Sequence, residues 1–332
     1  MKVLVTGADG VLGSNLVRDL LSRDYKVSVL LEAGKESPTL EGLDIQKFHG
    51  NILSPIDVEN ATKGQEGVIH AAASTSVFPA RSEIVNKVNI EGTQNIIDAC
   101  LKHKIKRLVY VGTANSFCFG SSKDNPGVEK GPYLSVKYGV DYMDSKQKAQ
   151  ELVLDYVKNH NLPALIVNPT FMIGPYDSKP SSGIMVLTIK KGGVPGYSGG
   201  GKNFVAVKDA ATALANALTM GRIGQCYILG NYNLTFKEAF ETIAEVVSAK
   251  APSRQLPNFI VVSYGRLMSL LAKIFKFYPA VTKELAVISC ENHFYSSEKA
   301  QKELLLPKTP LKVAIKECYD WFNENGYLDK KK

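Results

Sequence analysis

Three glycines follow an apolar run within the first thirteen residues of the chain. Val3 to Val5 is predicted to be a buried parallel strand, and residues 14–21 have helical apolar spacing. A strand that turns through glycine into a helix presents free backbone N–H groups at the positive end of the helix dipole, where a dinucleotide pyrophosphate binds. Gly7 would permit the tight turn, Gly10 would let phosphates approach the backbone, and Gly13 would let the helix pack on the strand. Glycines also occur in ordinary turns, but their place in a strand–turn–helix unit favours a phosphate site.

Segments with strand patterns alternate with segments with helical patterns through the first half of the chain. The predicted strands cover residues 2–6, 26–31, 45–49, 67–71, 107–112 and 164–168, with a shorter one at 225–229. The predicted helices cover residues 11–23, 54–63, 82–103, 137–160, 208–220, 235–250 and 311–325. This alternation is typical of βαβ units and predicts an α/β fold, a Rossmann-type doubly wound parallel sheet.

The pattern changes after about residue 170. Residues 192–201 are rich in glycine and have no periodicity, and the segments that follow are mostly helical. We expect residues 1–169 to form a dinucleotide-binding domain whose sheet is completed by segments near 205–230. Residues 170–332 are expected to form mainly a smaller C-terminal lobe that binds the substrate.

Charge and cysteine usage exclude several other classes of protein. The net charge of +8 comes from scattered basic residues, and the one dense cluster, at 330–332, indicates a frayed tail rather than a nucleic-acid site. The cysteines are odd in number, lie far apart and contain no Cys-x-x-Cys pair, which favours reduced thiols over a disulfide framework or a metal site. The first apolar run is too short for a signal peptide, so we expect a cytoplasmic protein.

The most apolar later stretch, residues 259–288, is interrupted by charged residues and a proline. These interruptions argue against a membrane span. We expect an amphipathic helix that lines a hydrophobic substrate cleft, and a helix lying on a membrane surface is the alternative.

Four Tyr-x-x-x-Lys pairs occur in the chain, so this spacing alone does not identify an active site. They are Tyr133/Lys137, Tyr142/Lys146, Tyr295/Lys299 and Tyr327/Lys331. Tyr142 and Lys146 are favoured because they open an amphipathic helix, on which residues four apart share a face. An ammonium beside the phenol favours the phenolate. Tyr142 could then donate a proton to a carbonyl oxygen in reduction, or remove one from an alcohol in oxidation.

Several motifs, taken in order, give the chain a clear resemblance to a known family. They are Thr6-Gly-x-x-Gly-x-x-Gly13, Val68-Ile-His-Ala-Ala-Ala73, Asn89-x-x-Gly-Thr-x-Asn95, Tyr142-x-x-Ser-Lys-x-x-Ala149, Asn168-Pro-Thr170 with Gly174-Pro175, and Asn203-Phe-Val205 followed by Asp209. In this arrangement the chain resembles the extended short-chain dehydrogenases/reductases over almost its whole length. That group includes nucleotide-sugar epimerases, dihydroflavonol-type reductases and 3β-hydroxysteroid-type dehydrogenases.

The resemblance implies a catalytic set of Thr113, Tyr142 and Lys146, with Ser116 as the alternative to Thr113. It implies that Lys146 also holds the nicotinamide ribose and that Asn89 supports a water relay to this lysine; an ordinary helix-kink asparagine is the alternative. The expected cofactor contacts are Gly7, Asp9, Gly10, Val11, Leu12, Gly13, Glu32, Asn51, Ile52, Ala71, Ala72, Ala73, Tyr142, Lys146, Asn168 and Pro169.

Glu32 indicates which dinucleotide the chain prefers. It ends the second predicted strand, where a carboxylate accepts hydrogen bonds from the ribose hydroxyls and repels a 2′-phosphate. Reductases of this group commonly have arginine here, so Glu32 favours NAD, while the nearby Lys35 keeps NADP possible. Asn51 stands where the group usually has an adenine-contacting aspartate.

Three functions agree with these motifs. We favour an NAD(P)-dependent oxidoreductase that interconverts a carbonyl and an alcohol on a small-molecule substrate. A nucleotide-sugar epimerase with tightly held NAD is the alternative, but the segment before Val205 lacks the arginines that would bind a nucleoside diphosphate. A non-catalytic dinucleotide-sensing protein would not need the Thr/Tyr/Lys set. The resemblance also implies a possible homodimer through the helices at 82–103 and 137–160.

Overall fold

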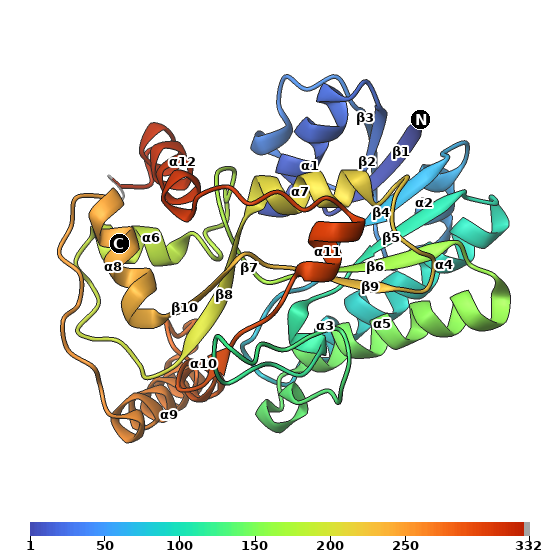
Figure 1. The fold of residues 1–332 in the computed structure, drawn as a ribbon. Coiled ribbons are helices and arrows are strands. Elements are labelled where there is room, and N and C mark those ends of the chain that lie inside the picture. The colour runs from blue at the N-terminus through green and yellow to red at the C-terminus, as the bar shows by residue number, and fades with distance from the viewer. Residues whose placement is uncertain (329–332) are drawn as a thin grey trace.

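The larger part of the fold is a seven-stranded, all-parallel sheet with the strand order β3-β2-β1-β4-β5-β6-β9 (Figure 1). The computed structural model describes residues 1–328, so the basic cluster at 330–332 lies outside the described residues. The strands are β1 (Lys2–Thr6), β2 (Lys26–Glu32), β3 (Gln46–Gly50), β4 (Gly67–His70), β5 (Arg107–Val111), β6 (Ala164–Pro169) and β9 (Cys226–Leu229). The strand order reverses between β1 and β4, and the predicted Rossmann-type α/β sheet is confirmed.

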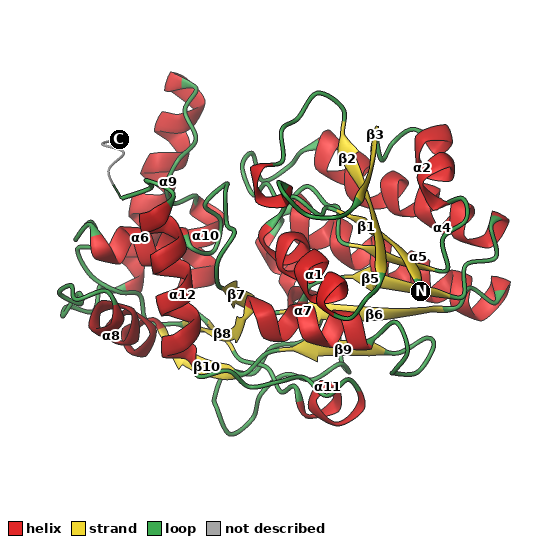
Figure 2. Cartoon of the chain, turned by 90° about the horizontal axis from the view of Figure 1, so that it is seen from above, coloured by secondary structure: helices red, strands yellow, loops and turns green. Residues whose placement is uncertain are grey.

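Helices cover both faces of this sheet because its central strands are buried on both sides, whereas the edge strand β3 is largely exposed. Val3 and Val5 of β1 face one core, which α1 (Val11–Ser22) and α7 (Val207–Asn216) close. Leu4 faces the opposite core, which α2 (Pro55–Thr62), α4 (Gly92–Lys102) and α5 (Asp141–His160) close. In Figure 2, α1 and α7 lie over the sheet and α4 and α5 lie behind it. Both layers are therefore buried against the sheet.

A second lobe is built around a small sheet centred on β8. It contains β7 (Phe171–Ile173), β8 (Gly201–Ala206), β10 (Tyr232–Thr235) and β11 (Asn292–His293). Strand β8 pairs in parallel with β7 and β11 and antiparallel with β10. The lobe's core also takes side chains from α6 (Ile184–Lys190), α8 (Phe236–Val246) and α12 (Leu311–Glu324). The remaining helices are α3 (Glu83–Asn86), α9 (Asn258–Phe275), α10 (Lys283–Ser289) and α11 (Glu298–Glu303).

Two predicted helices differ from the observed ones. The helix expected at 82–103 is divided into α3, a π-helical turn at Lys87–Glu91, and α4. The helix expected from 137 begins only at Asp141, because Gly139 adopts the left-handed conformation (φ 63°) and Val140 is extended. The π turn contains Asn89, and such turns occur frequently at functional sites.

Candidate functional site

A cleft of about 900 Å³ runs along the carboxyl ends of the parallel strands and continues into the second lobe. Its wall begins at the glycine turn after β1, passes the ends of β2, β4, β5 and β6, and reaches Lys202, His293 and Tyr295. Ligands of open α/β sheets bind at this edge, beside the point where the strand order reverses. The cleft is therefore the candidate active site.

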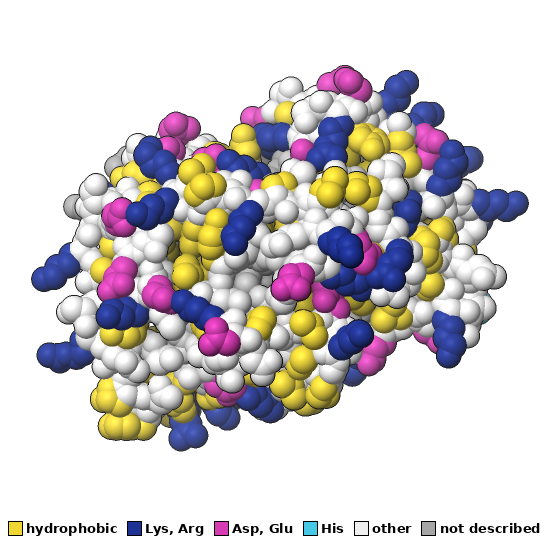
Figure 3. Space-filling view, viewed as in Figure 1, with side chains coloured by type: hydrophobic (Ala, Val, Ile, Leu, Met, Phe, Trp, Pro, Cys, Tyr) yellow, Lys and Arg dark blue, Asp and Glu magenta, His cyan; other side chains and the backbone are white. Residues whose placement is uncertain are grey.

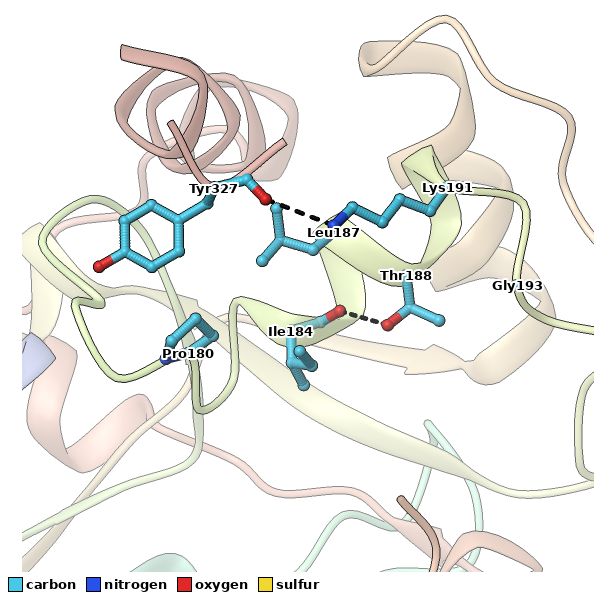
Figure 4. Close-up of a pocket in the computed structure, with 7 residues that line it drawn as sticks. All are labelled: Pro180, Ile184, Leu187, Thr188, Lys191, Gly193 and Tyr327. Atoms are coloured by element: carbon cyan, nitrogen blue, oxygen red, sulfur yellow. Dashed lines mark hydrogen bonds between the residues drawn. The ribbon is translucent and has the colours of Figure 1, made fainter. Parts of the chain in front are cut away.

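A smaller hollow of about 490 Å³ lies on the second lobe, between α6 and the chain after α12. It is lined by Pro180, Ile184, Leu187, Thr188, Lys191, Gly193 and Tyr327, and Lys191 Nζ donates a hydrogen bond to the carbonyl oxygen of Tyr327 at 3.4 Å (Figure 4). None of the residues predicted for catalysis or for cofactor binding lines this hollow.

The three glycines of the first turn have different structural roles. Gly7 has a φ of +70°, and an added Cβ there would lie 2.6 Å from the backbone nitrogen of Ala72. An added Cβ at Gly13 would lie 2.1 Å from the carbonyl oxygen of Gly7. At Gly10 the nearest protein atom would be 3.5 Å away, which is an ordinary contact. The fold itself therefore requires Gly7 and Gly13. Gly10 is not needed for packing, and its lack of a side chain leaves space in the cleft.

Helix α1 begins at this turn with an unshielded positive end. Gly10 is its N-cap and supplies no side-chain hydrogen bond, and the first turn of α1 has no acidic residue. The first N–H groups of a helix have no partner within the helix. The turn therefore fits the phosphates of a dinucleotide.

A chain of hydrogen bonds from His70 supports the cofactor end of the cleft. His70 Nδ1 lies 2.7 Å from Thr6 Oγ1, and His70 Nε2 lies 3.1 Å from Thr93 Oγ1. Thr93 donates to the carbonyl oxygen of Asn89, so its oxygen accepts from His70 Nε2. Thr6 Oγ1 accepts from the amide of Ala72 in the cleft wall, and it donates to His70 Nδ1. This pattern requires a neutral imidazole, and burial lowers the pKa of His70 to about 3.

Thr113, Tyr142 and Lys146 come together in the middle of the cleft. Strand β5 ends just before Thr113, and the first two turns of α5 carry Tyr142 and Lys146 on one face. Burial raises the pKa of Tyr142, while its hydrogen bond with Thr113 acts in the opposite direction. Ser116 does not line the cleft, so the geometry favours Thr113 as the hydroxyl beside Tyr142.

Lys146 is buried and is held by neutral groups. Its Nζ donates to the carbonyl oxygen of Val111 at 2.6 Å and lies 4.3 Å from the centroid of the Tyr110 ring. Burial lowers the pKa of Lys146 to about 7. The lysine can therefore change its charge near neutral pH, in the same cleft wall as Tyr142.

The other three Tyr-x-x-x-Lys pairs are not arranged in this way. Tyr133 does not line the cleft, and its hydroxyl donates to Asp144 Oδ1 at 2.8 Å. Tyr295 lines the cleft, but Lys299 donates to Gln225 and Cys226, 2.9 Å away in each case. The hydroxyl of Tyr327 donates to the carbonyl oxygen of Ser178, and Lys331 lies outside the described residues.

Two predicted site residues lie behind the cleft wall rather than in it. Asn89 accepts from the amide of Ser74 at 2.7 Å and donates to Ser145 Oγ at 2.9 Å, next to Lys146. Asn168 donates to the carbonyl oxygen of Thr113 at 3.1 Å and to Gln150 Oε1 at 2.7 Å. Both amides hold the segments that carry the three central residues, and the water relay through Asn89 stays a prediction.

The residues predicted to bind the adenosine half line the other end of the cleft. Glu32 is exposed and forms an ion pair with Lys35. Asn51 Oδ1 accepts from the amide of Leu53 at 2.9 Å, so this side chain stabilises its own turn. The cleft wall also includes Asp9, Val11, Leu12, Ile52, Ala71, Ala72, Ala73 and Pro169.

Sequence reasoning missed three residues at the substrate end of the cleft. The ammonium of Lys202 lies 4.8 Å from the centroid of the Phe171 ring, and burial lowers its pKa to about 8. His293 Nε2 lies 3.0 Å from the hydroxyl of Tyr138, and burial together with nearby lysines lowers its pKa to about 3. The hydroxyl of Tyr295 is buried without a hydrogen-bond partner in the structure. Lys202 could have been identified from the sequence, because it directly precedes the Asn203-Phe-Val205 motif. His293 has no such signal, because only the pairing of β11 with β8 brings it to the cleft.

Known proteins resemble this chain over nearly its whole length. A protein from Synechocystis sp. named "Putative dihydroflavonol 4-reductase" is 28% identical over 98% of this chain and 95% of its own. The decarboxylating sterol-4-alpha-carboxylate 3-dehydrogenase of Candida albicans is 26% identical over 97% of this chain and 98% of its own. The crystal structure of gox2253 is similar with a TM-score of 0.84 and 31% identity, over 98% of both chains.

The family model for the NAD dependent epimerase/dehydratase family matches residues 3–230. This range includes the glycine turn, Thr113 and the pair formed by Tyr142 and Lys146, as well as the strands that carry them. The chain belongs to the NAD dependent epimerase/dehydratase family, within the extended short-chain dehydrogenases/reductases.

Proposed function

We propose that this protein is an NAD-dependent oxidoreductase that interconverts a carbonyl and an alcohol on a small, largely apolar substrate. The observation that carries the proposal is the meeting of Thr113, Tyr142 and Lys146 in the cleft that begins at the glycine turn. A proton donor and a place for a dinucleotide are both needed for hydride transfer to a carbonyl, and the cleft offers both.

Each of the three central residues has a chemical role in this proposal. Tyr142 gives its proton to the carbonyl oxygen during reduction and takes one from the alcohol during oxidation. Thr113, hydrogen-bonded to Tyr142, orients the same substrate oxygen. Burial raises the pKa of the Tyr142 phenol, and Lys146, when charged, would lower it. The nicotinamide of the bound cofactor supplies or accepts the hydride.

The two parts of the chain divide the ligands between them. Residues 1–169, with β9 and α7, would hold the dinucleotide along the glycine turn, Glu32 and Asn51. The exposed carboxylate of Glu32 supports NAD over NADP, because it would repel a 2′-phosphate. Residues 170–332 would bind the substrate, where the cleft wall carries Phe171, Met172, Leu285 and Ile288.

Charge in the cleft supports an oxidoreductase over an epimerase. A nucleoside diphosphate calls for converging cations, most often arginines. Within residues 1–328 no arginine lines the cleft. Arg222, which is one of the arginines after residue 170, forms an ion pair with Glu303.

The cysteines support a reducing, cytoplasmic location, because all five are free thiols: Cys100, Cys118, Cys226, Cys290 and Cys318.

The proposal predicts that Tyr142→Phe abolishes turnover while leaving NADH affinity nearly unchanged, because only the proton donor is removed. Turnover by the wild type and the variant is measured with NADH and a panel of apolar ketones and aldehydes, and NADH affinity by fluorescence titration. Tyr133→Phe is the matched control, since Tyr133 has the same i, i+4 lysine but lies outside the cleft. Full activity of Tyr142→Phe, with loss of activity in Tyr133→Phe, would refute the assignment.

A further inference from the structure

Helix α9 and the turn after it expose an unusual band of large apolar side chains. Phe259 is 72% exposed, Phe275 is 70% exposed and Tyr278 is 62% exposed. Leu267, Leu270 and Ile274, between them, are also more than half exposed. Figure 3 shows hydrophobic side chains gathered at the lower left of the molecule, where α9 lies in Figure 1. Exposed apolar patches of this kind mark interaction surfaces in soluble proteins.

Helix α9 packs on the protein through its small residues. Its two buried residues are Gly265 and Ala272, and Val261, Val262, Met268 and Leu271 are half-buried, while its other large apolar side chains are exposed. An added Cβ at Gly265 would lie 2.6 Å from Cβ of Ala286 in α10, so the small face fits closely against the lobe. The packing of α9 therefore fixes its large apolar face toward the outside.

The charged residues from 258 to 283 are all basic, and the first acidic residue after them is Glu284 in α10. Arg266, Lys273 and Lys276 are exposed on α9 and its end, and Lys283 is exposed at the start of α10. Residues 258–283 contain no Asp or Glu. None of these four cations forms an ion pair with any residue in the range 1–328. An apolar band with a cationic rim complements a lipid surface that carries anionic headgroups.

We propose that α9 and the turn to Tyr278 dock this protein onto an anionic lipid surface, with α9 lying in the plane of the interface. Helix α9 is long and apolar enough to cross a membrane. Only 11% of it is buried in the protein, so it is not a core helix. Arg266 stands in the middle of α9, and Gly265 is packed against α10. Both features place the helix along the surface rather than across the bilayer.

The docking face lies beside the substrate end of the cleft. Helix α10, on which α9 packs, contributes Leu285 and Ile288 to the cleft wall. The Tyr278 ring packs edge-on against Phe78 at 5.8 Å, and the neighbouring Val77 also lines the cleft. This step rests on the proposed function: docking would bring an apolar alcohol or ketone dissolved in the membrane close to Tyr142.

The test is co-sedimentation of the full-length protein with two kinds of vesicle. One kind is pure phosphatidylcholine, and the other contains roughly a third phosphatidylglycerol. We expect binding to the anionic vesicles, and a loss of about tenfold or more when Leu267 and Phe275 are both replaced by Asp. Ile56→Asp is the matched control, since Ile56 on α2 is also 59% exposed but lies far from the band in sequence. All variants should keep wild-type NADH affinity, which shows that they fold.

Three outcomes would overturn the docking proposal. The first is that the wild type binds neither kind of vesicle, and the second is that the double variant binds as well as the wild type. The third is a dimer in analytical ultracentrifugation that dissociates only when both substitutions are present. The last outcome would identify the band as a protein–protein interface. Because vesicle binding by Tyr142→Phe should equal that of the wild type, failure of the oxidoreductase proposal leaves this test unaffected.

Discussion

Gly10 and Gly13 lie three residues apart but are required for different reasons. An added Cβ at Gly13 would collide with the Gly7 carbonyl oxygen at 2.1 Å, whereas one at Gly10 would have only an ordinary contact at 3.5 Å. The backbone must move in the first case and need not move in the second. The sequence motif predicts a packing role for Gly13 and phosphate approach at Gly10, and the contacts in the structure agree with the packing role of Gly13.

Gly13→Ala is expected to lower the free energy of unfolding by about 3 kcal/mol, because a methyl group is forced against backbone. Gly10→Ala should change stability by less than about 0.5 kcal/mol but weaken NADH binding by roughly tenfold or more, because the methyl group rises from the phosphate-binding wall. Urea denaturation and NADH titration of both variants check this. Wild-type NADH affinity in Gly10→Ala would contradict the phosphate site.

His70 makes stability depend on pH in a defined direction. Its folded-state pKa of about 3 lies below the ordinary value of 6.5, so between these values the unfolded chain binds one more proton than the folded chain. This contribution to stability is complete above pH 6.5 and is lost as the pH falls. From pH 7 to pH 5 the loss from His70 is about 2 kcal/mol.

Replacing His70 with Gln should remove this part of the pH dependence. Urea denaturation at pH 7 and pH 5 measures it, and His49→Gln serves as the control because His49 is exposed. The control should lose stability on acidification as the wild type does, while His70→Gln should lose less. Identical losses in all three proteins would show that His70 does not carry the effect.

At the scale of elements, most of the large sheet could be predicted from the sequence. Most of its strands are buried on both faces, so they are short apolar runs between turn residues, as Val3–Val5 is, whereas the edge strand β3 is polar and largely exposed. The interruption of the helix expected at 82–103 left no local pattern, and Asn89 inside the π turn donates hydrogen bonds to Ser74 and Ser145. These partners come from other parts of the chain.

The stretch at 259–288 shows why apolar spacing alone can mislead. It was expected to line the cleft, but α10 lines it while α9 faces outward. Spacing indicates that a helix has an apolar side and does not indicate which side packs on the protein. Here the small residues Gly265 and Ala272 decide the orientation, because they allow close approach to α10.

At the scale of the whole molecule, the cleft is made by segments far apart in the sequence. The dinucleotide end follows from local motifs, which is why its residues could be named in advance. The substrate end requires β8 and β11 to pair, which places Lys202 beside His293. Lys179 of the second lobe also forms an ion pair of 3.2 Å with Asp9 of the glycine turn, so the two lobes meet at the cleft. Such contacts depend on the complete fold and leave no local pattern.

The central claim is that this cleft uses NAD as an exchangeable substrate for hydride transfer. The most direct measurement is a mass-spectrometric assay of the purified protein for bound dinucleotide, followed by titration with NADH and NADPH. The account predicts a protein that is free of dinucleotide after purification, binds NADH reversibly and prefers it to NADPH because of Glu32. Failure to bind either dinucleotide would contradict the account, and NAD retained through purification would indicate an epimerase that recycles its cofactor instead.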